Sequence, residues 1–189
     1  MEAFLVSTGS VALAEMGDRT QLLALILAAR FRRPWPIAAG ILAATLANHA
    51  VAGAVGVWFG RLLTPSLLDT AVGGSMLAMA LWTLVPDKLD EGDRHARCNS
   101  GVFVTTLICF FLAEVGDKTQ IATLALAAAY SNLVAVIAGT TLGMMIANVP
   151  VVFIGKAFAG RLPMKAIRLG AALIFAALGI MFVVRAMAG

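Results

Sequence analysis

An acidic heptapeptide occurs twice in this chain, each time inside a long apolar stretch. The first copy reads Glu-Met-Gly-Asp-Arg-Thr-Gln at 15–21, and the second reads Glu-Val-Gly-Asp-Lys-Thr-Gln at 114–120. Both copies follow Leu-Ala and precede apolar, helix-forming residues. An ionised carboxylate in hydrocarbon costs at least a few kcal/mol, so four of them need a compensating reason. A duplicated carboxylate pair at membrane depth indicates first a cation or proton site.

The composition predicts an integral membrane protein in contact with the lipid bilayer. The chain is 61% hydrophobic and only 13% charged, whereas soluble domains are about 25% charged. Its 189 residues accommodate about six helices of ~20–25 residues with short connections, which leaves no room for a soluble domain of normal size. The net charge of +4 does not indicate a nucleic-acid partner, because the basic residues follow membrane topology, as described below.

We therefore expect an all-α fold of six transmembrane helices. The expected spans are 3–29, 36–60, 66–86, 101–129, 132–156 and 165–186. Prolines fall at the junctions between them, at positions 34, 36, 65, 86 and 163. A polar connector at 87–100 separates a first three-helix repeat, 1–86, from a second three-helix repeat, 101–189.

The two halves are internal repeats. The acidic motif recurs at an offset of 99, and Gly40 matches Gly139 at the same offset. Further on, Ala-Asn at 47–48 matches 147–148, and Gly-Arg-Leu at 60–62 matches 160–162, so one residue has been inserted. Three spans per repeat force the second repeat to enter from the opposite side, which predicts inverted topology.

The basic residues set the orientation. Ten of the fourteen fall on one side of the predicted membrane, and only Arg61 and Arg185 fall on the other; the remaining two belong to the motifs. By the positive-inside rule, the loops at 30–35, 87–100 and 157–164 are cytoplasmic and both termini are extracytoplasmic.

The motif residues are expected to share helix faces. Residues three and four apart lie on one face, which groups Glu15 with Asp18 and Arg19 in the first repeat. The same spacing groups the second set, Glu114, Asp117 and Lys118. Glu15 lies roughly 16 Å into its span at ~1.5 Å per residue, which is about half of a ~30 Å hydrocarbon core. Inversion then brings both motifs together near the midplane, where repeat-built transporters place their sites.

The other motif residues are expected to have supporting roles. Gln21 and Gln120 lie at the margin of the acidic face, whereas Thr20 and Thr119 point elsewhere and are expected to bond their own backbone. The motif glycines, Gly17 and Gly116, allow close approach of a helix or an ion, or local unwinding.

Charge counting favours a cation/proton antiporter. Four carboxylates and two basic residues leave a formal charge of −2, which one divalent cation or two protons would neutralise. Oxygen-only ligands favour hard ions such as Ca²⁺, Mn²⁺ or Mg²⁺.

Asn48 and Asn148 are either neutral oxygen ligands or interhelical hydrogen-bond residues, and both interpretations stay open. His49, which has Val149 at the matching position, is interpreted as a packing residue ahead of a proton relay.

The alternative to a functional site is a structural role for these charges. Glu15–Arg19 and Glu114–Lys118 would then be ion pairs within one helix that stabilise the bundle. That arrangement leaves Asp18 and Asp117 without basic partners, which favours a functional site.

Two copies of Glu-x-Gly-Asp-[Arg/Lys]-Thr in a predicted six-helix repeat resemble the Gdt-type family of Golgi, thylakoid and bacterial MneA-type manganese/calcium transporters. The resemblance covers essentially the whole chain. It implies secondary transport of Mn²⁺ and/or Ca²⁺ out of the cytosol against protons, with no prosthetic group. It also implies cation binding by a set of four acids, Glu15, Asp18, Glu114 and Asp117. The absence of a long N-terminal extension and the short central loop fit a prokaryotic plasma-membrane member.

Two other classes of function were considered. Intramembrane aspartyl proteases use two buried aspartates, one of them in Gly-x-Gly-Asp, but here Glu15 and Glu114 stand where that motif has its first glycine. A cation channel needs weak sites, whereas neutralisation of both occupied states favours tight, alternating binding. Homo-oligomerisation stays open.

Overall fold

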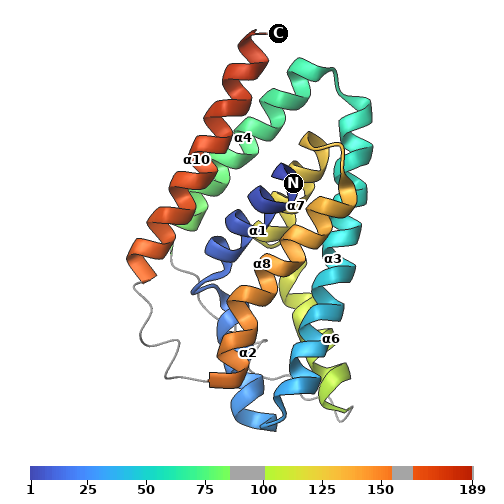
Figure 1. Ribbon diagram of the computed structural model, residues 1–189, viewed down its shortest axis with the longest axis vertical. Helices are drawn as coiled ribbons and strands as arrows, with labels where there is room; N and C mark the ends of the chain where they lie inside the picture. The colour runs from blue at the N-terminus through green and yellow to red at the C-terminus, as the bar shows by residue number, and fades with distance from the viewer. Residues whose placement is uncertain (86–100, 155–163, 189) are drawn as a thin grey trace.

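The computed structural model describes residues 1–85, 101–154 and 164–188, and these residues form eight α-helices and no strands (Figure 1). The helices are α1 (Glu2–Glu15), α2 (Arg19–Phe31), α3 (Pro34–Leu62), α4 (Pro65–Thr83), α6 (Val102–Glu114), α7 (Lys118–Ala129), α8 (Leu133–Ile154) and α10 (Met164–Ala188). The predicted connector at 87–100 and most of the predicted loop at 157–164 lie outside the described residues.

The two spans that carry the acidic motifs are broken, which corrects the expectation of continuous helices at 3–29 and 101–129. The first breaks between α1 and α2, and the second between α6 and α7. Gly17 has φ 82° and Gly116 has φ 76°. This left-handed conformation is readily adopted by glycine and interrupts a right-handed helix. Local unwinding, one of the two roles expected for these glycines, is therefore present in both motifs.

Helices occupy the other four predicted spans, with shifted boundaries. Pro34 and Pro65 stand in the first turn of α3 and α4, where the missing N–H of proline costs no helical hydrogen bond. By length and composition, α3, α8 and residues Lys165–Ala188 of α10 can each cross a membrane. The half-helices α1, α2, α6 and α7 have 14, 13, 13 and 12 residues, so each is too short to cross alone.

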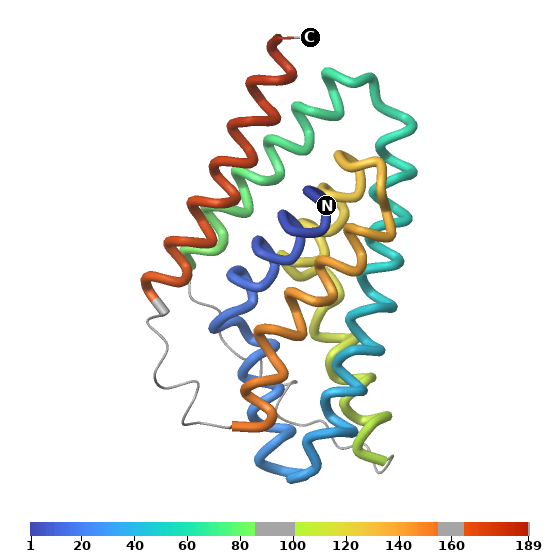
Figure 2. The backbone as a smooth tube through the Cα atoms, in the orientation of Figure 1, coloured from blue at the N-terminus to red at the C-terminus, as the bar shows by residue number. Residues whose placement is uncertain are grey.

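Helices from the two halves of the chain pack against one another. In Figure 1, α1 runs beside α8 and α4 runs beside α10, and the tube in Figure 2 follows the same pairs. In the same way, α3 packs along α6 and α7. Small residues permit these contacts: a Cβ built on Gly40 would lie 2.9 Å from the Phe103 carbonyl oxygen, and one built on Gly139 would lie 2.6 Å from the Phe4 carbonyl oxygen.

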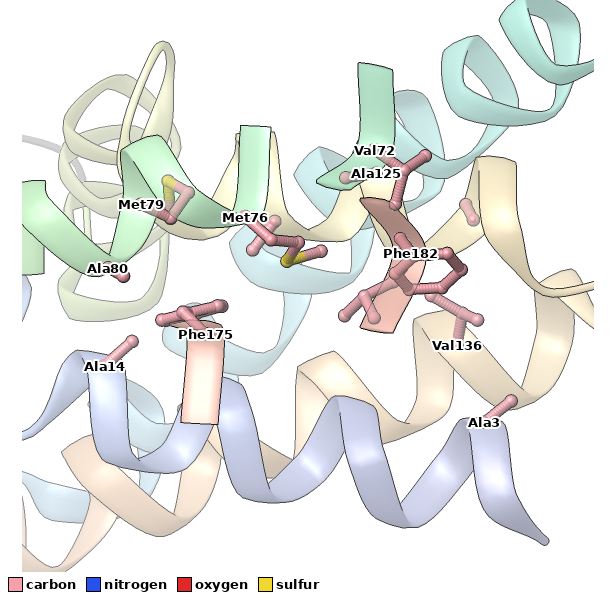
Figure 3. Packing of buried hydrophobic residues seen from close by; sticks show 13 residues of the cluster. Ala3, Ala14, Val72, Met76, Met79, Ala80, Ala125, Val136, Phe175 and Phe182 are labelled. Carbon is pink, nitrogen blue, oxygen red and sulfur yellow. The ribbon is translucent and has the colours of Figure 1, made fainter. Parts of the chain in front are cut away.

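The apolar core consists of two clusters. In the first, Phe175 and Phe182 of α10 lie close to Met76 and Val72 of α4 (Figure 3). The second is centred on α2, α3 and α6 and includes Phe110. Glu15, Asp18, Glu114 and Asp117 are buried as well, so the bundle encloses charged side chains in addition to this apolar core.

Candidate cation site

Three carboxylates meet at the two helix breaks. One oxygen each from Glu15, Asp18 and Asp117 lies within 4.8 Å of the others, and all three residues are buried. Glu15 ends α1, whereas Asp18 and Asp117 are the N-cap residues of α2 and α7. The N-terminus of a helix stabilises negative charge, so the breaks themselves favour aspartate at these two positions. Both halves of the chain contribute to this group, which we call the carboxylate cluster.

The basic motif residues pair across the two halves. Lys118 forms an ion pair with Asp18, and Arg19 lies 3.4 Å from Asp117 between Nη2 and Oδ1. The structural alternative, ion pairs within one helix that leave the aspartates without basic partners, is therefore not what the structure shows. The reason is the break, because residues on either side of a left-handed glycine no longer share a helix face.

Arg19 also spans the second break. Its Nη2 donates to the carbonyl oxygen of Ala113 at 2.7 Å, and this carbonyl lies in the last turn of α6. One guanidinium therefore neutralises part of the negative charge at the end of a helix and contacts the aspartate that begins the next helix. Both contacts come from the same nitrogen, Nη2.

The motif threonines contact the acids, which corrects the expectation that they bond their own backbone. Thr20 donates from Oγ1 to Oε2 of Glu15 at 2.5 Å. Thr119 donates from Oγ1 to Oδ2 of Asp117 at 3.3 Å. The second oxygen of Glu15, Oε1, is buried and has no hydrogen-bond partner among the described residues. A buried carboxylate oxygen without a donor is available to a cation or a proton.

The motif glutamines stabilise the breaks. The side-chain oxygen of Gln21 accepts the backbone N–H of Gly17 at 2.9 Å, and Gln120 does the same for Gly116 at 2.8 Å. Gln21 also donates from Nε2 to the Ala147 carbonyl oxygen of α8 at 2.9 Å. The two contacts to glycine satisfy backbone N–H groups of the unwound segments, and the third links Gln21 to α8.

Glu114 does not belong to the carboxylate cluster, although the sequence grouped it there. Its Oε1 accepts a hydrogen bond from Thr45 Oγ1 at 2.7 Å, and its Oε2 accepts one from Asn48 Nδ2 at 3.1 Å. Asn48 Nδ2 also donates to the Phe111 carbonyl oxygen at 3.1 Å. Sequence reasoning missed Thr45; the available signal was its position three residues before Asn48, on the same face of α3.

Asn148 has different contacts from Asn48. Its Nδ2 donates to the carbonyl oxygen of Met144 at 3.1 Å and lies 2.9 Å from the Met144 sulfur. Its Oδ1 is buried and has no hydrogen-bond partner among the described residues. The matching asparagines of the repeats are thus not equivalent in this structure.

His49 is fully buried, and neither of its ring nitrogens has a hydrogen-bond partner among the residues that the structure describes.

The arrangement suits a hard divalent cation. The cluster offers carboxylate oxygens only, which are preferred ligands of Ca²⁺, Mn²⁺ and Mg²⁺. Its three acids and two basic residues carry a formal charge of −1, since −3 and +2 sum to −1, and Glu114 brings the total to −2. Partial neutralisation by Arg19 and Lys118 allows the acids to be buried without a permanently bound ion.

Comparison with known proteins identifies the class. A family model described as "Divalent cation/proton antiporter GDT1" matches residues 3–91 and 102–189. The chain therefore belongs to the GDT1 family of divalent cation/proton antiporters, which is a family of membrane transporters and not of enzymes. The resemblance seen in the doubled motif is confirmed.

Individual relatives support the same assignment. A Vibrio cholerae protein named "Putative manganese exporter" is 52% identical over 169 residues, which cover 89% of this chain and 84% of that protein. The Synechocystis GDT1-like protein sll0615 is 29% identical over 194 residues, with 93% of each chain covered. The Saccharomyces cerevisiae divalent cation/proton antiporter GDT1 is 26% identical over 238 residues, covering 98% of this chain and 85% of the yeast protein. No solved structure matches the chain.

Proposed function

We propose that this protein exports Mn²⁺ and/or Ca²⁺ from the cytosol in exchange for protons, by alternating access at a midplane carboxylate site. The observation that carries the proposal is the convergence of Glu15, Asp18 and Asp117 from both halves of the chain. Membership of a divalent cation/proton antiporter family supports the reaction class.

The proposal includes six spans arranged as two inverted three-helix repeats. Each pair of half-helices, α1 with α2 and α6 with α7, then forms one broken span, and discontinuous spans are typical of transporter sites. The interleaved packing of α1 with α8, of α3 with α6 and α7, and of α4 with α10 supports this arrangement. So does Figure 1, in which the α2–α3 junction lies at the opposite end of the bundle from the α3–α4 and α7–α8 junctions.

The membrane orientation follows from charge and from these junctions. The α2–α3 junction carries Arg30, Arg32 and Arg33, so it faces the cytoplasm under the positive-inside rule. The start of α1 and the end of α10 lie in the other half of the bundle in Figure 1, and both termini are extracytoplasmic in the proposal. The bacterial relative in Vibrio cholerae supports a prokaryotic plasma membrane as the location.

Charge balance provides the exchange mechanism. The four motif acids and two basic residues carry a formal charge of −2, so one divalent cation or two protons produce a neutral site. A buried net charge is costly, so the site is expected to hold one divalent cation or two protons but not both at once, and the two ligands therefore exclude each other. In the proposed cycle, a cytosolic cation displaces protons from the carboxylates, the bundle reorients, and protons from outside expel the cation.

The ligands follow from the unpartnered and weakly held oxygens. Glu15 Oε1 has no donor among the described residues, and Asp117 is held by Arg19 at 3.4 Å, a long contact for an ion pair. Lys118 and Arg19 hold the aspartates when no cation is bound. The Vibrio cholerae relative is named "Putative manganese exporter", which supports Mn²⁺ as a substrate; Ca²⁺ binds the same class of oxygen ligands.

The experiment that tests the proposal is metal flux in proteoliposomes carrying a pH gradient, with Mn²⁺ and Ca²⁺ measured in parallel. The expected result is metal movement coupled to opposite proton movement, and its abolition when the gradient is collapsed. Protein-free vesicles are the control. Rapid metal flux that is independent of the proton gradient would indicate a channel, and no flux of either ion would contradict the proposal.

A further inference from the structure

Glu114 has two hydrogen bonds to α3 that its counterpart in the first repeat lacks. Thr45 donates to one of its oxygens at 2.7 Å, and Asn48 donates to the other at 3.1 Å. Thr45 and Asn48 are 0% and 1% exposed, so water does not compete for these bonds. We call Thr45 and Asn48 the Glu114 clamp.

The orientation of the Asn48 amide is fixed by chemistry. Its Nδ2 contacts the Phe111 carbonyl oxygen as well as Glu114, and a carbonyl oxygen can only accept a hydrogen bond. The NH₂ group must therefore face both partners. Asn48 thus acts on Glu114 as a donor, and its amide oxygen is not the atom presented to that carboxylate.

Within the part of the chain that the structure describes, such a clamp occurs on α3 and has no counterpart on α8. Gly40 of α3 and Gly139 of α8 occupy equivalent positions in the two repeats. Gly40 lies against Phe103 and Thr106. Gly139 lies against Phe4 and Ser7, which are the residues 99 positions before Phe103 and Thr106. Thr45 and Asn48 stand five and eight residues after Gly40 on α3. The side chains at the same spacing after Gly139 on α8 are Met144 and Ala147, neither of which carries a hydrogen-bond donor.

Glu15, the counterpart of Glu114 in the first repeat, has no such clamp in the described residues. No side chain of α8 donates to this carboxylate among the described contacts, and its Oε1 is buried without a hydrogen-bond partner in the described residues. Glu15 belongs to the carboxylate cluster, and Glu114 does not. Glu15 and Glu114 therefore differ because α3 has two hydrogen-bond donors, Thr45 and Asn48, where α8 has Met144 and Ala147.

We propose that Thr45 and Asn48 are positioning residues that hold Glu114 outside the cation cluster, and that the bound cation draws Glu114 from this clamp to complete its coordination during transport. The inference rests on the proposed function, since it assigns a role within the same exchange cycle. Both clamp bonds must break when Glu114 reaches the cation, and they form again when the cation leaves. The clamp thereby weakens the loaded state and favours release.

The proposal predicts opposite effects on affinity and turnover. When the clamp is removed, no binding energy is used to break its hydrogen bonds, so the loaded state becomes more stable. A more stable loaded state releases its cation more slowly. Hydrogen bonds to charged groups are among the stronger ones in proteins, so loss of one donor is expected to lower the apparent KM for Mn²⁺ about fivefold or more and to reduce the maximal rate.

The experiment is proton-driven Mn²⁺ flux in proteoliposomes as a function of Mn²⁺ concentration. The variants are Thr45→Val, which is nearly isosteric, and Asn48→Leu; Thr45→Ser keeps the donor and should restore wild-type values. Thr140→Val is the matched control, because Thr140 is buried on α8 and its hydroxyl bonds only the Val136 and Ile137 carbonyls among the described residues. Its KM and maximal rate should both stay near wild type.

The outcomes separate this inference from the function on which it rests. A lowered KM with a lowered maximal rate in both clamp variants, and normal values in Thr45→Ser, supports the clamp. A raised KM in Asn48→Leu would identify Asn48 as a cation ligand and would overturn the inference. An unchanged KM in Thr45→Val would mean that Glu114 does not move to the cation, which would overturn it as well. Absence of proton-driven flux in the wild type would instead overturn the proposed function.

Discussion

Lys118 at the start of α7 forms an ion pair with Asp18 at the start of α2, so the second half of the chain supplies the counter-charge for an acid of the first. Arg19 and Asp117 make the reciprocal contact at 3.4 Å. Each aspartate begins a half-helix, and each basic residue follows the aspartate of its own motif. Neither motif can build this charge arrangement alone, which gives the duplication a physical reason.

The Asp18–Lys118 pair is expected to contribute strongly to stability only as a pair. Both side chains are nearly inaccessible, at 0% and 3% exposure. Asp18→Asn or Lys118→Met alone breaks this buried pair and should lower the free energy of unfolding by about 3–5 kcal/mol. The double variant should be destabilised by less than the sum of the two single variants, because each single variant already removes the same contact.

The measurement is unfolding of the four proteins in detergent micelles by denaturant titration. A double-mutant cycle with coupling of about 1 kcal/mol or more supports the ion pair. Additive losses in the double variant would show that Asp18 and Lys118 act independently.

The left-handed glycine in each motif should not tolerate a side chain. Gly116 has φ 76° and open space around a built Cβ, so Gly116→Ala tests backbone conformation without a steric clash. We expect a loss of about 1–2 kcal/mol in unfolding free energy, with a smaller loss for Gly116→Asn because asparagine enters this conformation more readily.

Gly74→Ala provides the matched comparison. Gly74 lies inside α4, is exposed, and also has no atom within 4 Å of a built Cβ. Alanine in a regular helix should stabilise the protein by about 0.5–1 kcal/mol. If Gly116→Ala and Gly74→Ala change the unfolding free energy equally, the break does not depend on a left-handed residue.

Close approach of α1 and α8 should depend on Gly139. A Cβ at this position would lie 2.6 Å from the Phe4 carbonyl oxygen and 2.9 Å from the Ser7 Cβ, so Gly139→Ala must push the two helices apart. We expect destabilisation by about 1–3 kcal/mol, the usual cost of overpacking. Gly170→Ala on α10, where nothing lies within 4 Å of a built Cβ, should show no such loss. Thermal unfolding of the two variants in the same detergent is the measurement, and equal midpoints would contradict the packing.

Much of this fold could be predicted from the sequence because its strongest signals are local. Long apolar segments and terminal prolines predict where α3, α4, α8 and α10 lie to within a few residues. The doubled motif predicts which residues carry the chemistry, and three of its four acids do meet. Those signals depend on residue type and order, which the sequence displays directly.

The errors share one physical cause. The helical face that was expected to carry Glu15, Asp18 and Arg19 does not exist, because Gly17 adopts a positive φ between them. Once the helix breaks, partners are decided by contacts between distant segments: Lys118 with Asp18, and Thr45 with Glu114. Such contacts depend on how the halves interleave, and residue spacing within one motif carries no information about them.

The central claim is that the buried carboxylates of the helix breaks bind the transported cation. Glu15→Gln tests it most directly, because glutamine keeps the size of Glu15 and removes its charge from the carboxylate cluster. Glu2→Gln is the matched control on the same helix, since Glu2 is exposed at the start of α1 and lies outside the cluster. The measurement is proton-driven Mn²⁺ flux in proteoliposomes at equal protein content. The account predicts at least a tenfold loss of flux, equivalent to about 1.4 kcal/mol, in Glu15→Gln and near wild-type flux in Glu2→Gln; wild-type flux in Glu15→Gln would contradict it.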